Sequence, residues 1–95
     1  EPQTTIYVPN AFTPDDFDDT NPVFLPIVLD VKDYRFVVYN RLGRIIFETG
    51  DTKSGWDGTY KGKMVKDGVY PWFIRFRRAE TDLWEEHRGH VTLIR

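Results

Sequence analysis

The chain has 95 residues, a formal net charge of −2 and no cysteine, and its residues are 40% hydrophobic and 16% aromatic. This length suits one small domain whose core is built largely from aromatic rings, and the composition argues against disorder. The absence of cysteine excludes disulfides and thiolate metal sites, and no apolar run approaches the roughly 18 residues that a membrane helix needs.

The charge is distributed unevenly along the chain. Residues 1–33 contain seven acidic residues and one lysine, whereas residues 34–95 contain twelve basic and eight acidic residues. Acidic residues dilute the basic part so strongly that it does not form the contiguous basic surface typical of nucleic-acid binding. We therefore expect no nucleic-acid partner.

Short alternating segments separated by turn residues run along the chain, and this pattern indicates an all-β fold. The first expected strand covers residues 5–8 and stops at a Pro-Asn pair. Residues 23–25 stand between Pro22 and Pro26. Because proline cannot donate to a sheet ladder, an edge position or an extended connection is expected there, followed by a short strand at 27–29.

The clearest element is a hairpin in which residues 33–40 and 44–48 pair around the loop Arg-Leu-Gly at 41–43. A three-residue loop that ends in glycine is typical of a type I turn followed by a bulge, because its last residue has a positive φ.

Register within this hairpin decides which side chains share a face. We expect Val38 to face Ile46 and Tyr39 to face Ile45, with Phe47 on the same face as Tyr39. Both faces are then apolar, so the face turned away from the core becomes a candidate contact surface.

Two long strands are expected at 69–77 and 84–94, joined by a turn at 79–83. Pro71 interrupts the first of them, so its backbone nitrogen should meet solvent or a bulge. With these two strands the count is about seven, which is typical of an immunoglobulin-like β-sandwich. The side chains expected on the core face of the first strand are Tyr70, Trp72, Ile74 and Phe76.

The three tryptophans are expected to have different roles. Trp56 and Trp72 should be core rings, because a small domain without cysteine needs them there. Trp84 should be exposed. Asp57 should cap backbone amides of a turn rather than bind a ligand.

Four aspartates fall within residues 15–19 of the segment TPDDFDDTNP. An EF-hand-like loop that begins at Asp16 would use Asp16, Asp18 and Thr20 as ligands and would need glycine at its sixth position, where Asn21 stands. A solvated acidic turn is therefore favoured, and calcium at these four residues is the alternative.

No residue pattern indicates catalysis. The clustered aspartates share one wet environment, so their pKa values are not separated as a catalytic carboxylate pair requires. His87 and His90 are three residues apart, which places them on opposite faces of a strand. The sequence shows no nucleophile elbow and no phosphate loop. We therefore expect no enzymatic activity, no cofactor and no small-molecule substrate.

Five phrases, in order along the chain, carry a family resemblance. They are VPNAFTP at 8–14, YNRLG at 39–43, GWDGTYKG at 55–62, DGVY at 67–70 and GHVTLIR at 89–95. Together they resemble the gliding motility-associated C-terminal domain family, the type B sorting domains of the type IX secretion system of Bacteroidota. The chain departs from this pattern in its acidic loop, which lacks the family's glycines, and at Leu42, where tryptophan is commoner.

The resemblance implies one non-enzymatic C-terminal sorting domain, residues 1–95, excised from a larger secreted protein. Its cargo would pass through the periplasm and the outer membrane to the cell surface or the medium, and the signal peptide would lie at the far N-terminus of the precursor. The implied partners are the type IX machinery and a dedicated outer-membrane protein. We expect the isolated domain to be a monomer.

We predict that the partner contacts the hairpin tip and the C-terminal strand, where exposed aromatic and arginine side chains can anchor it. An edge strand in this region is also able to pair with a partner by strand addition. The predicted recognition residues are Tyr39, Asn40, Arg41, Leu42, Gly43, Trp84 and Arg95.

Two other functions stay open at this point. A carbohydrate-binding or adhesive module would present a row of exposed, coplanar aromatic rings. An extracellular immunoglobulin-like spacer could carry similar Trp-Asp-Gly turns, although a spacer need not end a chain.

Overall fold

The computed structural model describes residues 6–13 and 23–94, and in this part of the chain all regular secondary structure is β. These residues include no helix with the length and hydropathy of a membrane span. The described strands are β1 (Ile6–Tyr7), β2 (Ala11–Phe12), β3 (Ile27–Val28), β4 (Val31–Tyr39), β5 (Ile45–Thr49), β6 (Thr59–Tyr60), β7 (Lys63–Met64), β8 (Gly68–Arg78) and β9 (Trp84–Leu93).

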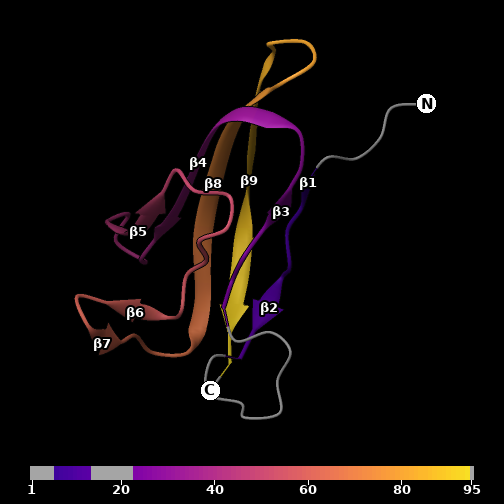
Figure 1. Cartoon of the computed structure of the whole chain (residues 1–95). Helices are drawn as coiled ribbons and strands as arrows, with labels where there is room; N and C mark the ends of the chain where they lie inside the picture. Colours follow the sequence, from indigo (N-terminus) through magenta and orange to yellow (C-terminus); the bar gives the residue numbers. More distant parts are fainter. Residues whose placement is uncertain (1–5, 14–22, 95) are drawn as a thin grey trace.

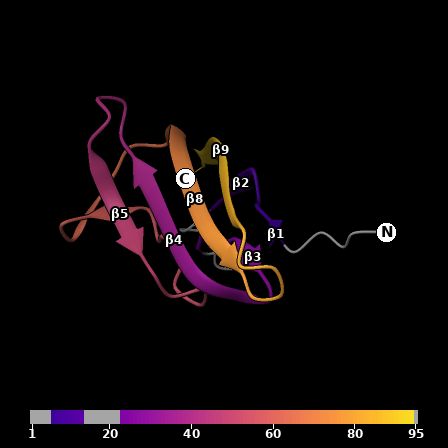
Figure 2. The ribbon, with the colours of Figure 1, turned by 90° about the horizontal axis from the view of Figure 1, so that it is seen from above.

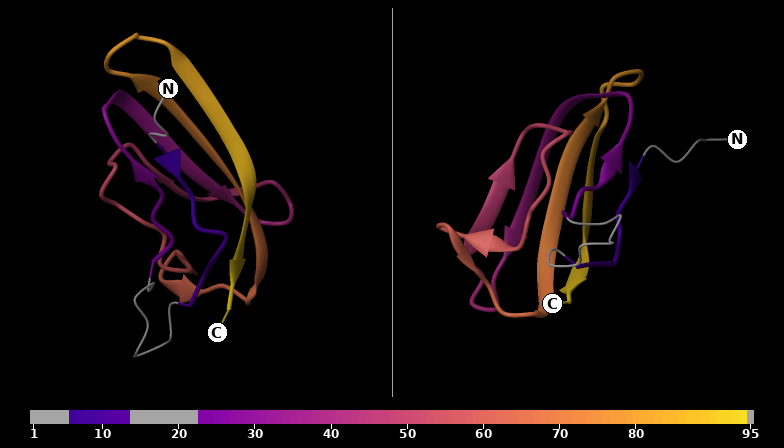
Figure 3. Two further views of the ribbon diagram at one scale, coloured as in Figure 1. Left: turned by 90° about the vertical axis from the view of Figure 1, so that its right-hand side faces the viewer. Right: turned by 60° about the horizontal axis from the view of Figure 1, so that its bottom comes forward.

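The largest element is a five-stranded sheet with the order β2-β9-β8-β4-β5 (Figures 1 and 2). Its long neighbours pair antiparallel, whereas β2 runs parallel to the end of β9. The pairs β1-β3 and β6-β7 form two further two-stranded sheets. Figure 3 shows these small sheets gathered on one side of the large sheet. The all-β prediction is therefore confirmed, but the expected count of about seven strands is not confirmed.

Aromatic rings fill the space between the large sheet and the segments that cover it. Trp56 and Phe24 exchange two backbone hydrogen bonds, of 2.7 and 3.0 Å, and both side chains are fully buried. The Trp56 ring packs 5.2 Å from Tyr70 and the Phe24 ring 5.3 Å from Phe36, between ring centroids. The core cluster consists of Phe12, Phe24, Val28, Tyr34, Phe36, Val38, Ile46, Trp56, Tyr70, Trp72, Ile74, Phe76, Val91 and Leu93.

The turn that follows Trp56 is structural, as expected. The carboxylate Oδ1 of Asp57 accepts hydrogen bonds from the backbone nitrogen of Thr59, at 3.1 Å, and from its hydroxyl, at 2.7 Å. The indole nitrogen of Trp56 donates to the carbonyl of Thr59 at 2.9 Å. Gly58 has a φ of 86°, which disfavours residues with a Cβ. The turn therefore anchors the ring that closes the core.

The predicted register of the β4–β5 hairpin is partly wrong. Tyr39 pairs with Ile45 as expected, but Val38 pairs with Phe47 rather than with Ile46. The register shifts between these pairs, and a bulge that inserts one residue turns the following side chain to the other face. Phe47 consequently packs on the core, with its ring centroid 5.6 Å from that of Phe36.

Candidate recognition surface

The second face of the large sheet carries polar and aromatic side chains, and among residues 6–13 and 23–94 no other sheet packs on it. The cross-strand pairs Val37 with Phe73, Arg75 with Glu86, and Arg77 with Trp84 place their side chains together on this face. We call it the open face. It is formed by Asp33, Arg35, Val37, Tyr39, Glu48, Phe73, Arg75, Arg77, Trp84, Glu86, Arg88 and His90.

Arginines on this face lie over aromatic rings. The guanidinium carbon of Arg75 is 4.2 Å from the ring centroid of Trp84, and that of Arg77 is 5.4 Å from the same centroid. Arg88 lies 5.0 Å from the centroid of Phe73. All three distances are shorter than about 6 Å, and Trp84 is 48% exposed, which fits cation–π contacts of modest strength.

Burial of Val37 shows how tightly these long side chains cover the sheet. Val37 is 1% exposed although it does not belong to the core cluster. It pairs with Phe73 on one neighbouring strand and with Glu48 on the other. Long charged side chains bury apolar surface with their stems while their charged ends stay in water, so Val37 is buried although no sheet within residues 6–13 and 23–94 packs on this face.

Ion pairs on the open face leave positive charge in excess. Arg35 pairs with Glu48 at 2.5 Å, and a similar bond of 2.6 Å joins Arg77 to Asp33. Arg75 and Arg88 share a single carboxylate, that of Glu86, at 3.7 and 3.8 Å. Four arginines thus face three carboxylates, a difference of +1. Since these side chains are largely exposed, each pair contributes little to the stability of the fold.

A groove of about 570 Å³ opens beside the first half of β8 and the middle of β9. Its lining combines aromatic rings with the cationic side chain of Arg88 and the imidazole of His90, so it suits a ligand with an apolar part and an acidic part. The lining residues are Tyr39, Pro71, Trp72, Phe73, Arg88, Gly89 and His90.

The hairpin tip has a shape set by Asn40. Its side-chain oxygen accepts hydrogen bonds from the backbone nitrogens of Leu42 and Arg44, both at 2.9 Å. Gly43 donates its backbone N–H to the carbonyl of Asn40 at 3.0 Å and has a φ of 83°, as the loop pattern predicted. Leu42 is left 91% exposed. The tip is therefore a well-ordered projection with an apolar end.

A second groove, of about 270 Å³, runs under this tip. It lies between the hairpin and the segment that carries β6 and β7. The lining residues are Asn40, Arg41, Leu42, Ile46, Tyr60, Val65, Lys66 and Tyr70.

The predicted recognition residues fall in two places. Tyr39 lines the groove on the open face, and the tip residues 40–43 follow it directly. Trp84 lies at the other end of the sheet, because it pairs with Arg77 while the groove lies beside Pro71. Six strand residues, or roughly 20 Å, separate Trp84 from His90. Arg95 lies outside the described residues, as do the proposed calcium ligands Asp16, Asp18, Thr20 and Asn21.

Sequence reasoning missed the arginines of the open face. Arg75 and Arg77 alternate with core residues along β8, so their face was available from the period of the strand. What the sequence does not contain is the position of Arg88 and Glu86, which depends on the register between β8 and β9.

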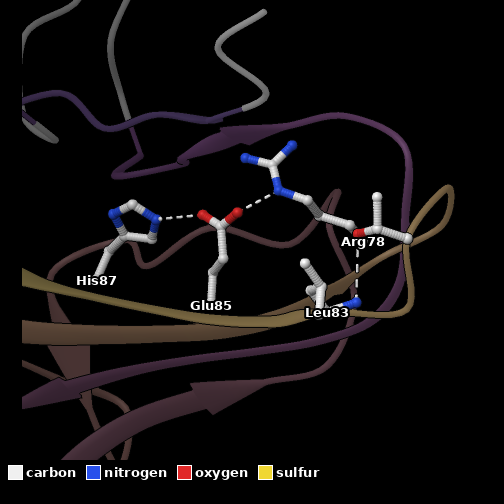
Figure 4. A network of polar contacts seen from close by, with 5 residues as sticks. Arg78, Leu83, Glu85 and His87 are labelled. Atoms are coloured by element: carbon white, nitrogen blue, oxygen red, sulfur yellow. Dashed lines mark hydrogen bonds and ion pairs between the residues drawn. The ribbon is translucent and has the colours of Figure 1, made fainter. Parts of the chain in front are cut away.

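At the end of the core face, Glu85 lies between the guanidinium of Arg78 and the imidazole of His87 (Figure 4). Its carboxylate pairs with the guanidinium of Arg78, and its other oxygen lies 3.2 Å from Nε2 of His87. The hydrogen bond from Arg78 holds the pKa of Glu85 below its ordinary value, against a smaller opposing effect of burial. His87 stacks on Phe76 at 5.6 Å between centroids.

The described residues contain no group of three or more acidic or histidine side chains arranged to hold a metal ion. His87 and His90 do lie on opposite faces of β9, since His87 stacks on the core ring of Phe76 whereas His90 lines the groove of the open face. The two histidines therefore do not lie together on one face of the strand.

Neither a curated protein nor a solved structure matches the chain significantly. A family model described as the CHU_C type IX secretion signal domain matches residues 6–93. This match covers nearly all of the chain, including the open face, the hairpin and both long strands. The chain therefore belongs to the CHU_C family of type IX secretion signal domains, and it has the role of a C-terminal sorting signal in that secretion system.

Proposed function

We propose that the secretion machinery recognises this domain through the open face and the adjoining hairpin tip. The family membership supplies the sorting role, and the proposal concerns the surface that performs it. Binding of this kind needs a surface that other proteins can reach, and it needs no chemistry by the domain itself. We expect the domain to have no enzymatic activity.

The observation that carries the proposal is an ordered face of arginine and aromatic side chains with no described layer over it. Arginine and tryptophan are the side chains that most often dominate binding energy at protein interfaces. Here Arg75 and Trp84 are already held together at 4.2 Å. Their order in the free protein reduces the entropy that a partner would otherwise have to remove on binding.

The expected partners are the type IX machinery and a dedicated outer-membrane protein. The route leads through the outer membrane to the cell surface or the medium, and the domain is expected to arrive there as a monomer. We further propose that the large sheet and the segments covering its core face form an immunoglobulin-like β-sandwich. The two-layer core around Trp56 supports this assignment.

The acidic turn is proposed to work without a metal. Any ion that binds only the folded state raises its stability. If the acidic turn binds no calcium, the addition of calcium should therefore leave the melting temperature unchanged. A clear rise would instead support a site at the acidic turn.

No observation favours the adhesive alternative. Sugar rings stack on flat, accessible aromatic faces, whereas Arg75 and Arg77 lie over the Trp84 ring. The family match points to sorting rather than to adhesion.

The test is a fluorescent reporter that carries an export signal and this domain, in a host with a type IX system and the cognate outer-membrane protein. The wild-type fusion should reach the medium or the cell surface. The variant Arg75→Glu/Arg77→Glu should be retained in the periplasm, because reversed charge opposes a complementary partner.

A matched control changes the net charge equally on exposed lysines outside the open face, at Lys53→Glu/Lys61→Glu. This control should be exported like the wild type. Equal export of both double variants would contradict the proposed surface. Retention of the wild-type fusion itself would contradict the sorting role.

A further inference from the structure

The strand β9 has an edge with no described partner over most of its length. β9 has ten residues, but only Thr92 and Leu93 pair with β2 on this edge. Within 6–13 and 23–94, no other strand pairs with Trp84–Val91 on the side away from β8. An unpaired row of backbone N–H and C=O groups is a template for an additional strand.

The strand's hydrogen bonds show which backbone groups point outward. Thr92 donates its N–H to the carbonyl of Asn10, and Ile94 donates to Phe12, at 2.9 and 3.0 Å. Because the direction of the backbone groups repeats every second residue and the β8–β9 register has no shift, the even-numbered residues face this edge. The residues that offer N–H and C=O groups there are Trp84, Glu86, Arg88 and His90.

The position of Pro71 agrees with the assignment of the even-numbered residues of β9 to the outer edge. Pro71 is opposite His90 and has no N–H to donate. A pair of this kind is tolerated where the two residues do not exchange hydrogen bonds. The backbone groups of His90 are therefore directed away from β8.

The sequence explains why the described N-terminal strands leave most of this edge unpaired. β2 reaches only Thr92 and Leu93, and Pro9 precedes β2 by two residues. Proline has no N–H for continuing the ladder. Instead, β1 pairs with β3 in a separate sheet (Figures 1 and 3).

The opposite edge of the same sheet is protected. β5 has five residues and a bulge against β4, and short, bulged edge strands resist pairing. β9 is twice as long and pairs with β8 without a shift. Strand addition is thus favoured at one edge only.

The side chains beside this edge are cationic and aromatic. The side chain of Arg88 is 75% exposed, and among the described residues its one ion pair is the 3.8 Å contact with Glu86, which Arg75 also contacts. Arg88 and His90 line the groove of about 570 Å³ on the open face. A segment paired with β9 would place every second side chain over this groove.

We propose that an extended acidic segment of the partner protein pairs with Glu86–His90 as an additional strand. The carboxylates of this segment would bind Arg88 and approach His90, and its backbone would pair with the outward groups of β9. This assignment rests on the proposed function and names the binding mode of the same surface. Backbone pairing supplies affinity in such complexes, and the side chains supply selectivity.

Amide hydrogen exchange tests the free edge first. In the isolated domain, the amides of Glu86, Arg88 and His90 should exchange fast, whereas those of His87 and Gly89 should be protected because they donate to β8. Protection of the outward amides in the free domain would overturn the proposal, because the chain or a second copy would then already occupy this edge.

A peptide probe tests the partner chemistry. An eight-residue peptide alternating glutamate with valine, capped at both ends, should protect the three outward amides. The matching peptide with lysine in place of glutamate should bind at least about tenfold more weakly, because like charges then face each other. No protection with the acidic peptide, or equal binding of the two peptides, would overturn the proposal.

Proline substitution separates the backbone from the side chain. Glu86→Pro removes one outward N–H and leaves the β8 ladder intact, whereas Glu86→Ala keeps this N–H. Both variants lose the Glu86 carboxylate, but only Glu86→Pro loses the N–H, so peptide binding by Glu86→Pro should be about tenfold weaker than by Glu86→Ala, since a lost hydrogen bond has about this effect. Equal binding by both would overturn strand addition.

Folding and export controls complete the test. The melting temperature of Glu86→Pro identifies a variant that has lost its fold, in which case Arg88→Pro against Arg88→Ala provides the same comparison. In the reporter assay, strand addition predicts that Glu86→Pro is exported severalfold less than Glu86→Ala, which lacks the same carboxylate but keeps the N–H. Equal export of the wild type and both variants would contradict strand addition while leaving the sorting role intact.

Discussion

The two faces of the large sheet differ in how their side chains meet water: one face is buried and the other is exposed. On the covered face, Phe36, Ile74 and Phe76 are 0% exposed, and the Phe36 ring packs on that of Phe24. On the open face, Arg35 and Arg75 keep about half of their side chains in water. Buried rings contribute much of a small domain's stability, whereas exposed ion pairs contribute little. We infer that the covered face carries stability and the open face carries recognition.

The largest effect is expected on the covered face at Trp56. Trp56→Ala would remove the ring that packs on Phe12 and Tyr70 and should lower the free energy of unfolding by about 3–5 kcal/mol. Urea denaturation of the purified domain measures this loss. Trp84→Ala, on the open face, is the comparison and should lose less than about 1 kcal/mol. Equal losses would contradict the division between the faces.

A smaller effect on the covered face is expected at Gly89. A Cβ at this position would lie 2.7 Å from Cζ2 of Trp72, so the indole must move to admit it. Gly89→Ala should therefore lower the free energy of unfolding by about 1–3 kcal/mol. Gly50→Ala is the matched control, because its Cβ would meet its nearest atom at 3.4 Å. If both variants have the same melting temperature, the indole does not pack against Gly89.

At the hairpin tip, Asn40→Ala should have an intermediate effect. The variant loses the two hydrogen bonds that Asn40 accepts from Leu42 and Arg44, and a cost of about 1 kcal/mol is expected because the site is exposed. Asn40→Asp keeps an acceptor oxygen and should retain most of this stability. Thermal unfolding of the pair distinguishes a role in shaping the tip from a general loss of packing.

The smallest effect is expected from Glu85 and depends on pH. Arg78 lowers the pKa of Glu85 in the folded protein, so its carboxylate stabilises the fold above the ordinary glutamate pKa of about 4.3. This contribution disappears as the pH falls through the lowered folded value. Glu85→Gln should melt below the wild type at pH 7 and approach it in acid. A difference that persists unchanged in acid would exclude the carboxylate as its cause.

Prediction from the sequence succeeded where local patterns decide the structure. The alternation along β8 correctly separated Tyr70 and Phe76 from the outward side chains, and the loop pattern correctly indicated a positive φ at Gly43. It failed at Phe47, because a bulge that reverses the facing of a strand is not visible in the alternation. The arginines of the open face become a surface only through pairing between distant strands, and the recognition surface stays a prediction.

Fold and site thus differ in what determines them. Buried positions follow from the need to hide apolar rings, which each segment of sequence shows by itself. The open face depends on which arginine lies beside which ring, as Arg75 does beside Trp84. This arrangement follows from strand register, which no single segment shows.

The measurement that tests the central claim most directly is the amount of exported reporter per folded molecule for Arg75→Ala/Trp84→Ala. This double variant removes the closest cation–π pair of the open face and leaves the core rings in place. We predict that its free energy of unfolding stays within about 1 kcal/mol of the wild type, while export falls severalfold. Unchanged export by the folded variant would contradict the assignment of recognition to the open face.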